Sequence, residues 1–307
     1  MSAIAHGGGS VLIGDGAIPN GPPEPSETGS GRTLLGSLRR PGALFGIAVL
    51  MSWLLVAVIA PLTAPSSPTA PSAGTLLAPS AAHWFGTDEL GRDVFSRVLY
   101  GSRLSLPLAL LLVMLASIVG SSIGAFAGFA GGVIDSAIMR VTDMFFAFPS
   151  IVLTMAFAAA LGPSLQSAVL AIVIVSWPPY ARIVRGLVLA MRSSNYVTVS
   201  RLLGASSARL LVRDVLPNVI GPVLVVATLD IGSAVLLLAG LSFLGLGAQP
   251  PAAEWGAMVA TATEFFSNWW MGLFPGLAIA SVVFAVNTIG DALRDYFDPR
   301  SLVRPTR

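Results

Sequence analysis

The chain has 307 residues, of which 54% are hydrophobic and only 10% are charged, and its mean hydropathy is +0.81. A soluble domain carries about 25% charged residues, so this composition indicates a multi-pass membrane protein. The net charge is only +2, and no basic run is interleaved with aromatic residues, so a nucleic-acid partner is not expected. The chain has no cysteine, and its two histidines, His6 and His83, are far apart, so the sequence predicts neither disulfides nor a metal site.

The first part of the chain combines a polar tail with an apolar segment. Residues 1–38 are rich in Gly, Pro and Ser, which predicts a disordered cytoplasmic tail. Residues 39–62 predict the first transmembrane helix, because their apolar part is long enough to cross the ~30 Å hydrocarbon core. A cleaved signal peptide is the alternative, but its apolar region is usually only about 7–15 residues long.

Residues 63–103 are predicted to form the longest external loop. Within it, residues 88–100 have an amphipathic pattern, and Thr87 precedes them as a candidate N-cap. The pattern predicts an interfacial helix that lies along the membrane surface. We expect its charged side chains to have a structural role rather than to contact a substrate.

Residues 104–130 predict the second span, in which small residues recur at every fourth position as Gly120, Gly124 and Gly128. This spacing allows another helix to approach closely, either within the chain or in a neighbouring subunit. Residues 136–161 predict the third span, with a kink at Pro149. Near its start, Asp143 is expected to pair with Arg140, three residues earlier.

Residues 164–184 predict the fourth span, which Pro178 and Pro179 are expected to bend or break. Proteins of the membrane place irregular backbone where it lines a cavity, so Trp177 and Pro178 are candidate path residues. Residues 219–244 predict the fifth span, which contains the carboxylate of Asp230. Because a buried charge is costly in a membrane, Asp230 either contacts a cationic ligand, pairs with polar neighbours, or snorkels to the interface.

The last part of the chain predicts an external loop after Gly245 and a sixth span at about residues 271–289. Three tryptophans in this region are interpreted as an interfacial belt: Trp255, Trp269 and Trp270. Residues 301–307 are expected to form a cytoplasmic tail. The sequence therefore predicts an all-α polytopic membrane protein with six transmembrane helices and both termini in the cytoplasm.

The polar stretch at about residues 185–218 carries several arginines against one carboxylate, which places it on the cytoplasmic side. Two helical pieces are predicted to meet at Gly204, where a sharp turn requires a positive φ, and Pro217 ends the second piece. The stretch is either a docking surface or an ordinary basic loop that determines topology.

Three segments resemble one family. Residues 85–101 (FGTDELGRDVFSRVLYG) resemble the signature that precedes the second span in C-type permeases of ABC importers for dipeptides, oligopeptides and nickel. Residues 241–251 and 290–300 match the same family, so the resemblance covers about residues 83–300. The signature residues carried over are Gly86, Thr87, Asp88, Gly91, Arg92, Asp93 and Arg97.

The arginine-rich stretch resembles the coupling loop of these permeases, through which they contact their ATPases. Gly204, Leu216 and Pro217 match its pattern, whereas the family's Glu-Ala-Ala is replaced by Thr198, Val199 and Ser200. We therefore expect a weaker or altered anchor at Thr198. The coupling residues implied by the resemblance are Tyr196, Thr198, Ser200, Arg201, Gly204, Ala205, Asp214, Leu216 and Pro217.

The resemblance implies a type I ABC-importer permease in the plasma membrane of a bacterium, with residues 104–300 as the core domain. Its implied partners are membrane lipid, a second homologous permease, two ATP-binding cassette ATPases and an external solute-binding protein. The chain has no lysine and therefore no P-loop, so we expect no enzymatic activity and no cofactor here, with ATP and Mg bound by the ATPases.

The sequence leaves the cargo open. Import of dipeptides or oligopeptides is the main hypothesis, and import of nickel or a metal chelate is the alternative. A secondary transporter that needs no ATPase is a further alternative, for which Asp230 is the main support. The family usually carries a carboxylate later in the fifth span, where this chain has Leu238, so no cargo role is carried over to Asp230.

Overall fold

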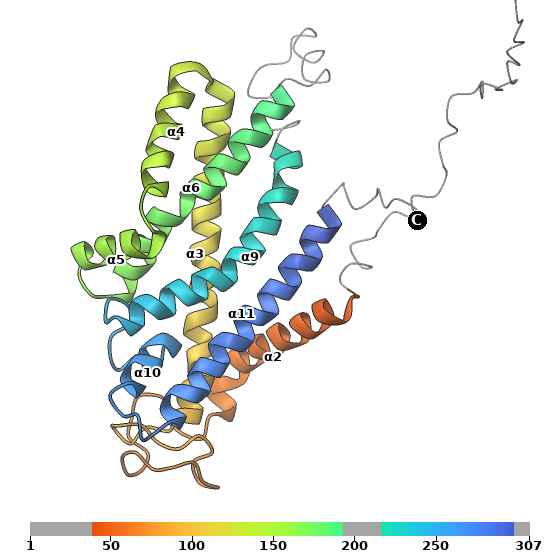
Figure 1. Cartoon of the computed structure of the whole chain (residues 1–307). Helices are drawn as coiled ribbons and strands as arrows, with labels where there is room; N and C mark the ends of the chain where they lie inside the picture. The colour runs from red at the N-terminus through yellow and green to blue at the C-terminus, as the bar shows by residue number, and fades with distance from the viewer. Residues whose placement is uncertain (1–38, 193–215, 298–307) are drawn as a thin grey trace, which may run out of the picture. The chain divides into compact units, whose positions relative to one another are not determined.

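The computed structural model describes residues 39–192 and 216–297, and these residues are almost entirely helical. The helices are α2 (Pro41–Thr63), α3 (Val94–Ala130), α4 (Gly132–Phe146), α5 (Ser150–Leu161), α6 (Leu165–Arg192), α9 (Leu216–Phe243), α10 (Trp255–Ala262) and α11 (Trp270–Phe297) (Figure 1). The all-α prediction is confirmed. The predicted N-terminal tail, most of the coupling loop and the C-terminal tail lie outside the described residues.

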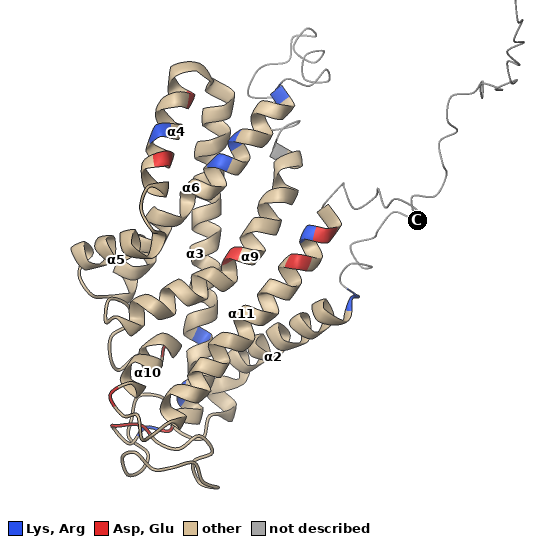
Figure 2. Ribbon diagram, in the orientation of Figure 1, with Lys and Arg blue, Asp and Glu red and all other residues tan. Residues whose placement is uncertain are grey.

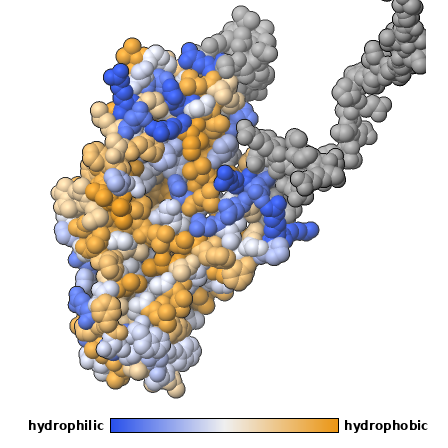
Figure 3. All heavy atoms as spheres, in the orientation of Figure 1, coloured by the Kyte–Doolittle hydropathy of each residue, from blue (hydrophilic) through white to orange (hydrophobic). Residues whose placement is uncertain are grey.

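Within the described residues, five helices are long and apolar enough to cross a membrane: α2, α3, α6, α9 and α11. The pair α4 and α5 adds a sixth span if its two arms, bent by 92°, are counted as one. Figure 3 shows hydrophobic residues over the middle of the drawn face. Figure 2 shows charged residues mainly on α4, on the upper part of α6, at the upper end of α11 and in the loops near α10, with one acidic residue in the middle of α9. This distribution is typical of a multi-pass membrane protein.

Helix α3 is the element on which the others assemble, because it contacts α2, α4, α6, α9, α10 and α11 (Figure 1). Its glycines lie against α6. A Cβ on Gly120 would fall 2.3 Å from the Trp177 carbonyl oxygen, and one on Gly124 would fall 2.2 Å from that of Ala181. The predicted close approach is therefore used within the chain, between α3 and α6.

The third predicted span is broken at its centre. Helix α4 ends at Phe146, and Pro149 is the N-cap of α5, so the kink predicted at Pro149 is confirmed. The predicted Arg140–Asp143 pair is wrong. Asp143 instead pairs with Arg182, at 2.5 Å between the Oδ1 and Nη2 atoms, because α6 lies beside α4 and supplies a guanidinium from another helix.

Helix α6 runs without a break through Pro178 and Pro179, so the predicted break is wrong. The two prolines remove two backbone N–H donors from the helix, but they do not remove the contacts that the helix makes with its neighbours. Residues on both sides of this pair, Trp177 and Ala181, lie against glycines of α3. We infer that this contact helps to keep the helix continuous.

The predicted helix over residues 88–100 is also wrong in its start and its setting. Helix α3 begins at Val94, and Asp93 rather than Thr87 is its N-cap, accepting a hydrogen bond from the Ser96 N–H at 2.8 Å. In the first turns of α3, the side chains on the charged side, such as Arg97, are buried, and so are those on the apolar side. These turns therefore continue the second span and do not form an interfacial helix.

The tryptophan belt is wrong for two of its three members. Trp255 and Trp270 are 0% and 6% exposed, and their indole N–H groups donate to the carbonyls of Val98 and Thr87. Only Trp269 has the exposed position expected of a belt residue. Burial is tolerated because each indole N–H has a partner.

The beginning of α2 and the end of α11 lie together. Arg40, which precedes α2, forms an ion pair with Asp295 near the end of α11, and the two helices pack along their length. The first and last described helices are thus tied at the same end of the helical assembly.

Candidate functional site

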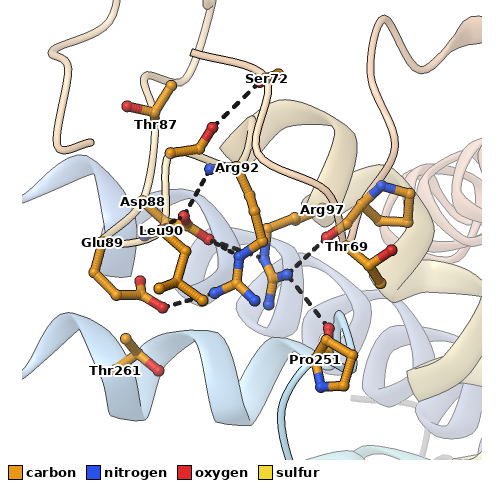
Figure 4. Close-up of polar contacts among 12 residues, drawn as sticks. Thr69, Ser72, Thr87, Asp88, Glu89, Leu90, Arg92, Arg97, Pro251 and Thr261 are labelled. Atoms are coloured by element: carbon orange, nitrogen blue, oxygen red, sulfur yellow. Dashed lines mark hydrogen bonds and ion pairs between the residues drawn. The ribbon is translucent and has the colours of Figure 1, made fainter. Parts of the chain in front are cut away.

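Two sets of polar residues stand out. The first is the Asp88 cluster, which we define as Asp88, Glu89, Arg92 and Arg97 (Figure 4). The Asp88 carboxylate accepts hydrogen bonds from the Arg92 backbone N–H at 2.8 Å and from the Arg92 Nε at 2.6 Å. Arg92 also pairs with Glu89, at 2.6 Å between Nη2 and Oε1. The charges are paired, which is the condition for burying them.

Arg97 connects this cluster to two distant segments. Its Nε lies 3.4 Å from the Asp88 carboxylate, and its Nη1 donates to the Pro68 carbonyl at 2.7 Å. Its guanidinium also donates to Ala252 in the segment before α10, at 3.3 Å (Figure 4 shows the Pro251 side of this contact). One side chain thus holds the loop before α3 and the loop before α10 together.

The remaining signature residues shape the loop around this cluster. Gly86 and Gly91 have φ values of +72° and +71°, and a Cβ on either would fall within 2.5 Å of a backbone oxygen. The Thr87 hydroxyl donates to the Gly74 carbonyl at 2.7 Å and accepts from the Leu77 N–H at 2.8 Å. Asp93 caps α3 and pairs with His83 at 3.0 Å.

All seven signature residues thus lie together in one buried region at the beginning of α3. Asp88, Arg92 and Arg97 are each 4–5% exposed, so a ligand has little access to their charges. Their contacts join loop to loop and loop to helix. The arrangement supports the expected structural role for these charges.

The second set lines a cavity of about 160 Å³ between α3, α5, α6 and α9. Its polar lining is Asp230 from α9 together with Ser150, Ser176, Tyr180 and Ser233. Apolar side chains such as Leu112 and Ile172 make up the rest of the wall, and no basic residue belongs to it. The cavity is therefore an apolar chamber with one carboxylate and several hydroxyls.

Tyr180 is the least accessible polar residue of this cavity, with 1% of its surface exposed. Its hydroxyl makes no hydrogen bond of normal geometry within the described residues, but it lies close enough to Asp230 to interact with the carboxylate. Ser150 and Ser233 are exposed, which places them toward the open side.

The other two path candidates lie elsewhere. Trp177 lines a separate apolar groove with Phe126 and Val141, and its ring contacts that of Phe145. Pro178 is buried within α6. Neither residue lines the Asp230 cavity, which takes Ser176, Pro179 and Tyr180 from the same stretch of α6.

The coupling residues Tyr196, Thr198, Ser200, Arg201, Gly204, Ala205 and Asp214 lie outside the described residues. Leu216 and Pro217 are the first two described residues of α9, so the Leu-Pro pair belongs to this helix and does not precede it. No group of three or more His, Cys, Asp or Glu side chains in the described part of the chain is placed to hold a metal ion.

Sequence reasoning missed Tyr180 and Glu254. Glu254 is 1% exposed and caps α10, its Oε2 accepting from the Ala257 N–H at 2.9 Å. The only signal for α10 was an acidic residue before a short apolar run. Tyr180 follows the two prolines directly, but nothing in the sequence indicates that it lies beside Asp230, fifty residues later.

The helical fold with five or six candidate spans is that of a multi-pass membrane protein. In its fold the chain is similar to the permease in structures of the inward-facing MetNI methionine ABC transporter. The TM-score is 0.54 at 18% identity, over 68% of this chain and 98% of that one. The type I ABC-importer permease fold implied by the resemblance is therefore confirmed.

Residues 120–303 match the family of binding-protein-dependent transport system inner membrane components. The chain is 46% identical to the probable D,D-dipeptide transport system permease protein DdpC of Escherichia coli, over 85% of this chain and 88% of that protein. It is 45% identical to the nickel transport system permease protein NikC of the same organism, over 73% and 81%. The chain belongs to this family of inner membrane transport components and is a multi-pass integral membrane protein.

Proposed function

We propose that this chain is a permease subunit of an ATP-driven importer of dipeptides or oligopeptides in a bacterial plasma membrane. The observation that carries the proposal is the 46% identity to a dipeptide permease over nearly the whole chain. The Asp230 cavity, with a single carboxylate and hydroxyls, suits an organic cation better than a bare metal ion.

The partners follow from the family. A second homologous permease completes the translocation path, two ATPase subunits bind ATP and Mg and hydrolyse ATP, and an external solute-binding protein delivers cargo. The chain itself has no P-loop, so in this proposal it contributes the path and the coupling rather than ATP hydrolysis. Forming the translocation path and coupling it to ATP hydrolysis both require the spans to move relative to each other, between an outward-open and an inward-open state.

Coupling is assigned to the Tyr196–Pro217 loop. The matches at Gly204, Leu216 and Pro217 support this assignment. Thr198 replaces the family's glutamate, so we expect a weaker or altered contact with the ATPase at this position. Because Leu216 and Pro217 begin α9, a displacement of the loop would be transmitted directly into the helix that carries Asp230.

Nickel or metal-chelate import is the second candidate, favoured by the 45% identity to a nickel permease. An ATPase-independent secondary transporter is a third, for which Asp230 is the main support. Purification of the tagged chain after co-expression with its chromosomal neighbours separates these classes. Recovery of a second permease and two ATPases, with ATP hydrolysis stimulated by a loaded binding protein, supports the importer.

Recovery of the chain alone, or as a homo-oligomer without ATPases, contradicts the importer and favours a secondary transporter. Uptake into proteoliposomes then separates the cargoes. Uptake of a labelled dipeptide supports the peptide proposal, whereas nickel uptake without dipeptide uptake overturns it.

A further inference from the structure

We propose that the Asp230 cavity binds the primary ammonium group of the cargo, with Asp230 and Tyr180 as the residues that recognise it. The proposal rests on peptide import as the function and names the end of the peptide that this chain contacts. No motif in the sequence assigns this site, because its residues come from four helices: α3, α5, α6 and α9.

The first argument is that the Asp230 carboxylate has no cationic side chain beside it in the cavity. Tyr180 is almost fully buried, and its hydroxyl lacks a hydrogen bond of normal geometry within the described residues. Asp230 lies beside it, and no arginine lines the cavity to neutralise the carboxylate. A carboxylate inside a membrane protein normally pairs with a cation or faces water. Asp230 is only partly buried and has no basic residue beside it in the lining, so a cationic occupant that enters from the open side can reach the carboxylate.

The second argument is the chemistry of the donor set. An ammonium group has three N–H donors and one positive charge, so it needs one anion and neighbouring acceptors. Asp230 supplies the anion, and the hydroxyls of Ser176, Tyr180 and Ser233 supply acceptors on two facing helices. A divalent metal ion would favour more carboxylate or imidazole ligands than the single carboxylate found here.

The third argument is size and orientation. A dry cavity of about 150 Å³ holds a benzene-sized molecule, so about 160 Å³ accommodates one amino-terminal residue rather than a whole dipeptide. The exposed Ser150 and Ser233 mark the open side, and Tyr180 marks the closed side. The amino end therefore enters while the peptide carboxylate, which Asp230 repels, stays outside.

The test is direct binding to the purified complete transporter in lipid nanodiscs, without the binding protein. Alanyl-alanine and N-acetyl-alanyl-alanine serve as probes, followed by saturation-transfer NMR. The unblocked peptide is expected to bind at least about tenfold more tightly, since the blocked one loses a charge-assisted hydrogen bond. Asp230→Asn should abolish this preference, and Asp230→Glu should retain part of it.

Tyr180→Phe should weaken binding of the unblocked peptide without affecting the blocked one. Thr228→Val is the matched control, because the Thr228 hydroxyl bonds the Leu224 carbonyl of its own helix and does not line the cavity. Asp230→Asn preserves the size of a partly buried side chain and removes its charge, so correct folding is expected and is checked by size-exclusion chromatography.

Equal binding of the two peptides, or unchanged binding in Asp230→Asn, overturns the proposal. Displacement of alanyl-alanine by Ni²⁺ in the wild type but not in Asp230→Asn overturns it in favour of a metal site. Uptake assays distinguish this failure from that of the proposed function. Dipeptide uptake without amine-dependent binding rejects the site alone, whereas amine-dependent binding without dipeptide uptake rejects peptide import.

Discussion

Gly124 of α3 lies directly against Ala181 of α6: a Cβ built on Gly124 would fall 2.2 Å from the Ala181 carbonyl oxygen. Gly120 and Gly128 make the same kind of approach one turn before and one turn after, to Trp177 and Arg185. This contact sets the distance between α3 and α6, and each of these two helices forms one wall of the Asp230 cavity. The geometry of the cavity therefore depends on glycines that do not line it.

Gly124→Ala is expected to destabilise the protein. The added methyl group would overlap the α6 backbone, and overpacking of this kind costs about 1–3 kcal/mol. Gly186→Ala is the control, because nothing lies within 4 Å of a Cβ on Gly186, and alanine favours a helix over glycine by about 1 kcal/mol. Thermal unfolding in detergent should show a lower Tm for the first variant only. A Tm at or above wild type for Gly124→Ala would contradict the close contact.

Asp88→Asn is expected to destabilise the loops around the Asp88 cluster. It leaves Arg97 buried with carbonyl partners but without its anion, and breaking a buried pair costs about 3–5 kcal/mol. Protease sensitivity of residues 64–93 should rise, together with a lower Tm. Glu264→Gln, at an exposed acidic residue, is the control and should behave as wild type. Equal protease sensitivity of the two variants would show that the cluster does not hold the loops.

The two ion pairs between α4 and α6 are expected to differ in strength. Asp135–Arg185 is bidentate, at 2.5 and 2.6 Å, with side chains 11% and 31% exposed, whereas Asp143–Arg182 has one hydrogen bond and side chains 66% and 50% exposed. Exposed pairs contribute only about 0.2–1 kcal/mol. Double-mutant cycles with alanine should give a larger coupling energy for Asp135–Arg185, and the reverse order would refute the structural ranking.

Gly204→Pro is expected to separate ATP hydrolysis from transport, if the Tyr196–Pro217 loop contacts the ATPases as proposed. Proline removes an N–H and restricts the residue before it, so the turn between the two predicted helical pieces would be lost. The chain should still insert and assemble. ATPase activity and peptide uptake, measured in the same proteoliposomes, check this prediction. Normal uptake would indicate a loop that determines only topology.

The helical class and the approximate positions of the spans were predictable from the sequence. Long apolar segments have few stable solutions in a bilayer, because every backbone polar group must be satisfied within the segment. The kink at Pro149 was predictable for a similar reason, since proline removes a local hydrogen bond. The spans and the kink depend only on residues close together in the sequence and on the surrounding bilayer.

The wrong predictions about side-chain partners concern residues that lie far apart in the sequence. Arg140 was the nearest arginine to Asp143 on its own helix, but α6 brings Arg182 closer. Trp255 and Trp270 have the composition of belt residues, yet the carbonyls of Val98 and Thr87 allow them to be buried. Local spacing cannot reveal a partner that another helix supplies.

The sequence by itself determined that this protein is a helical membrane permease component, because hydropathy, arginine distribution and three family motifs are all local properties of the chain. Only the tertiary structure decided what the polar groups do. Arg97 joins two loops separated from each other by more than 180 residues, and Tyr180 meets Asp230 across two helices. Burial and pairing are properties of neighbours in space, and helix packing alone brings those neighbours together.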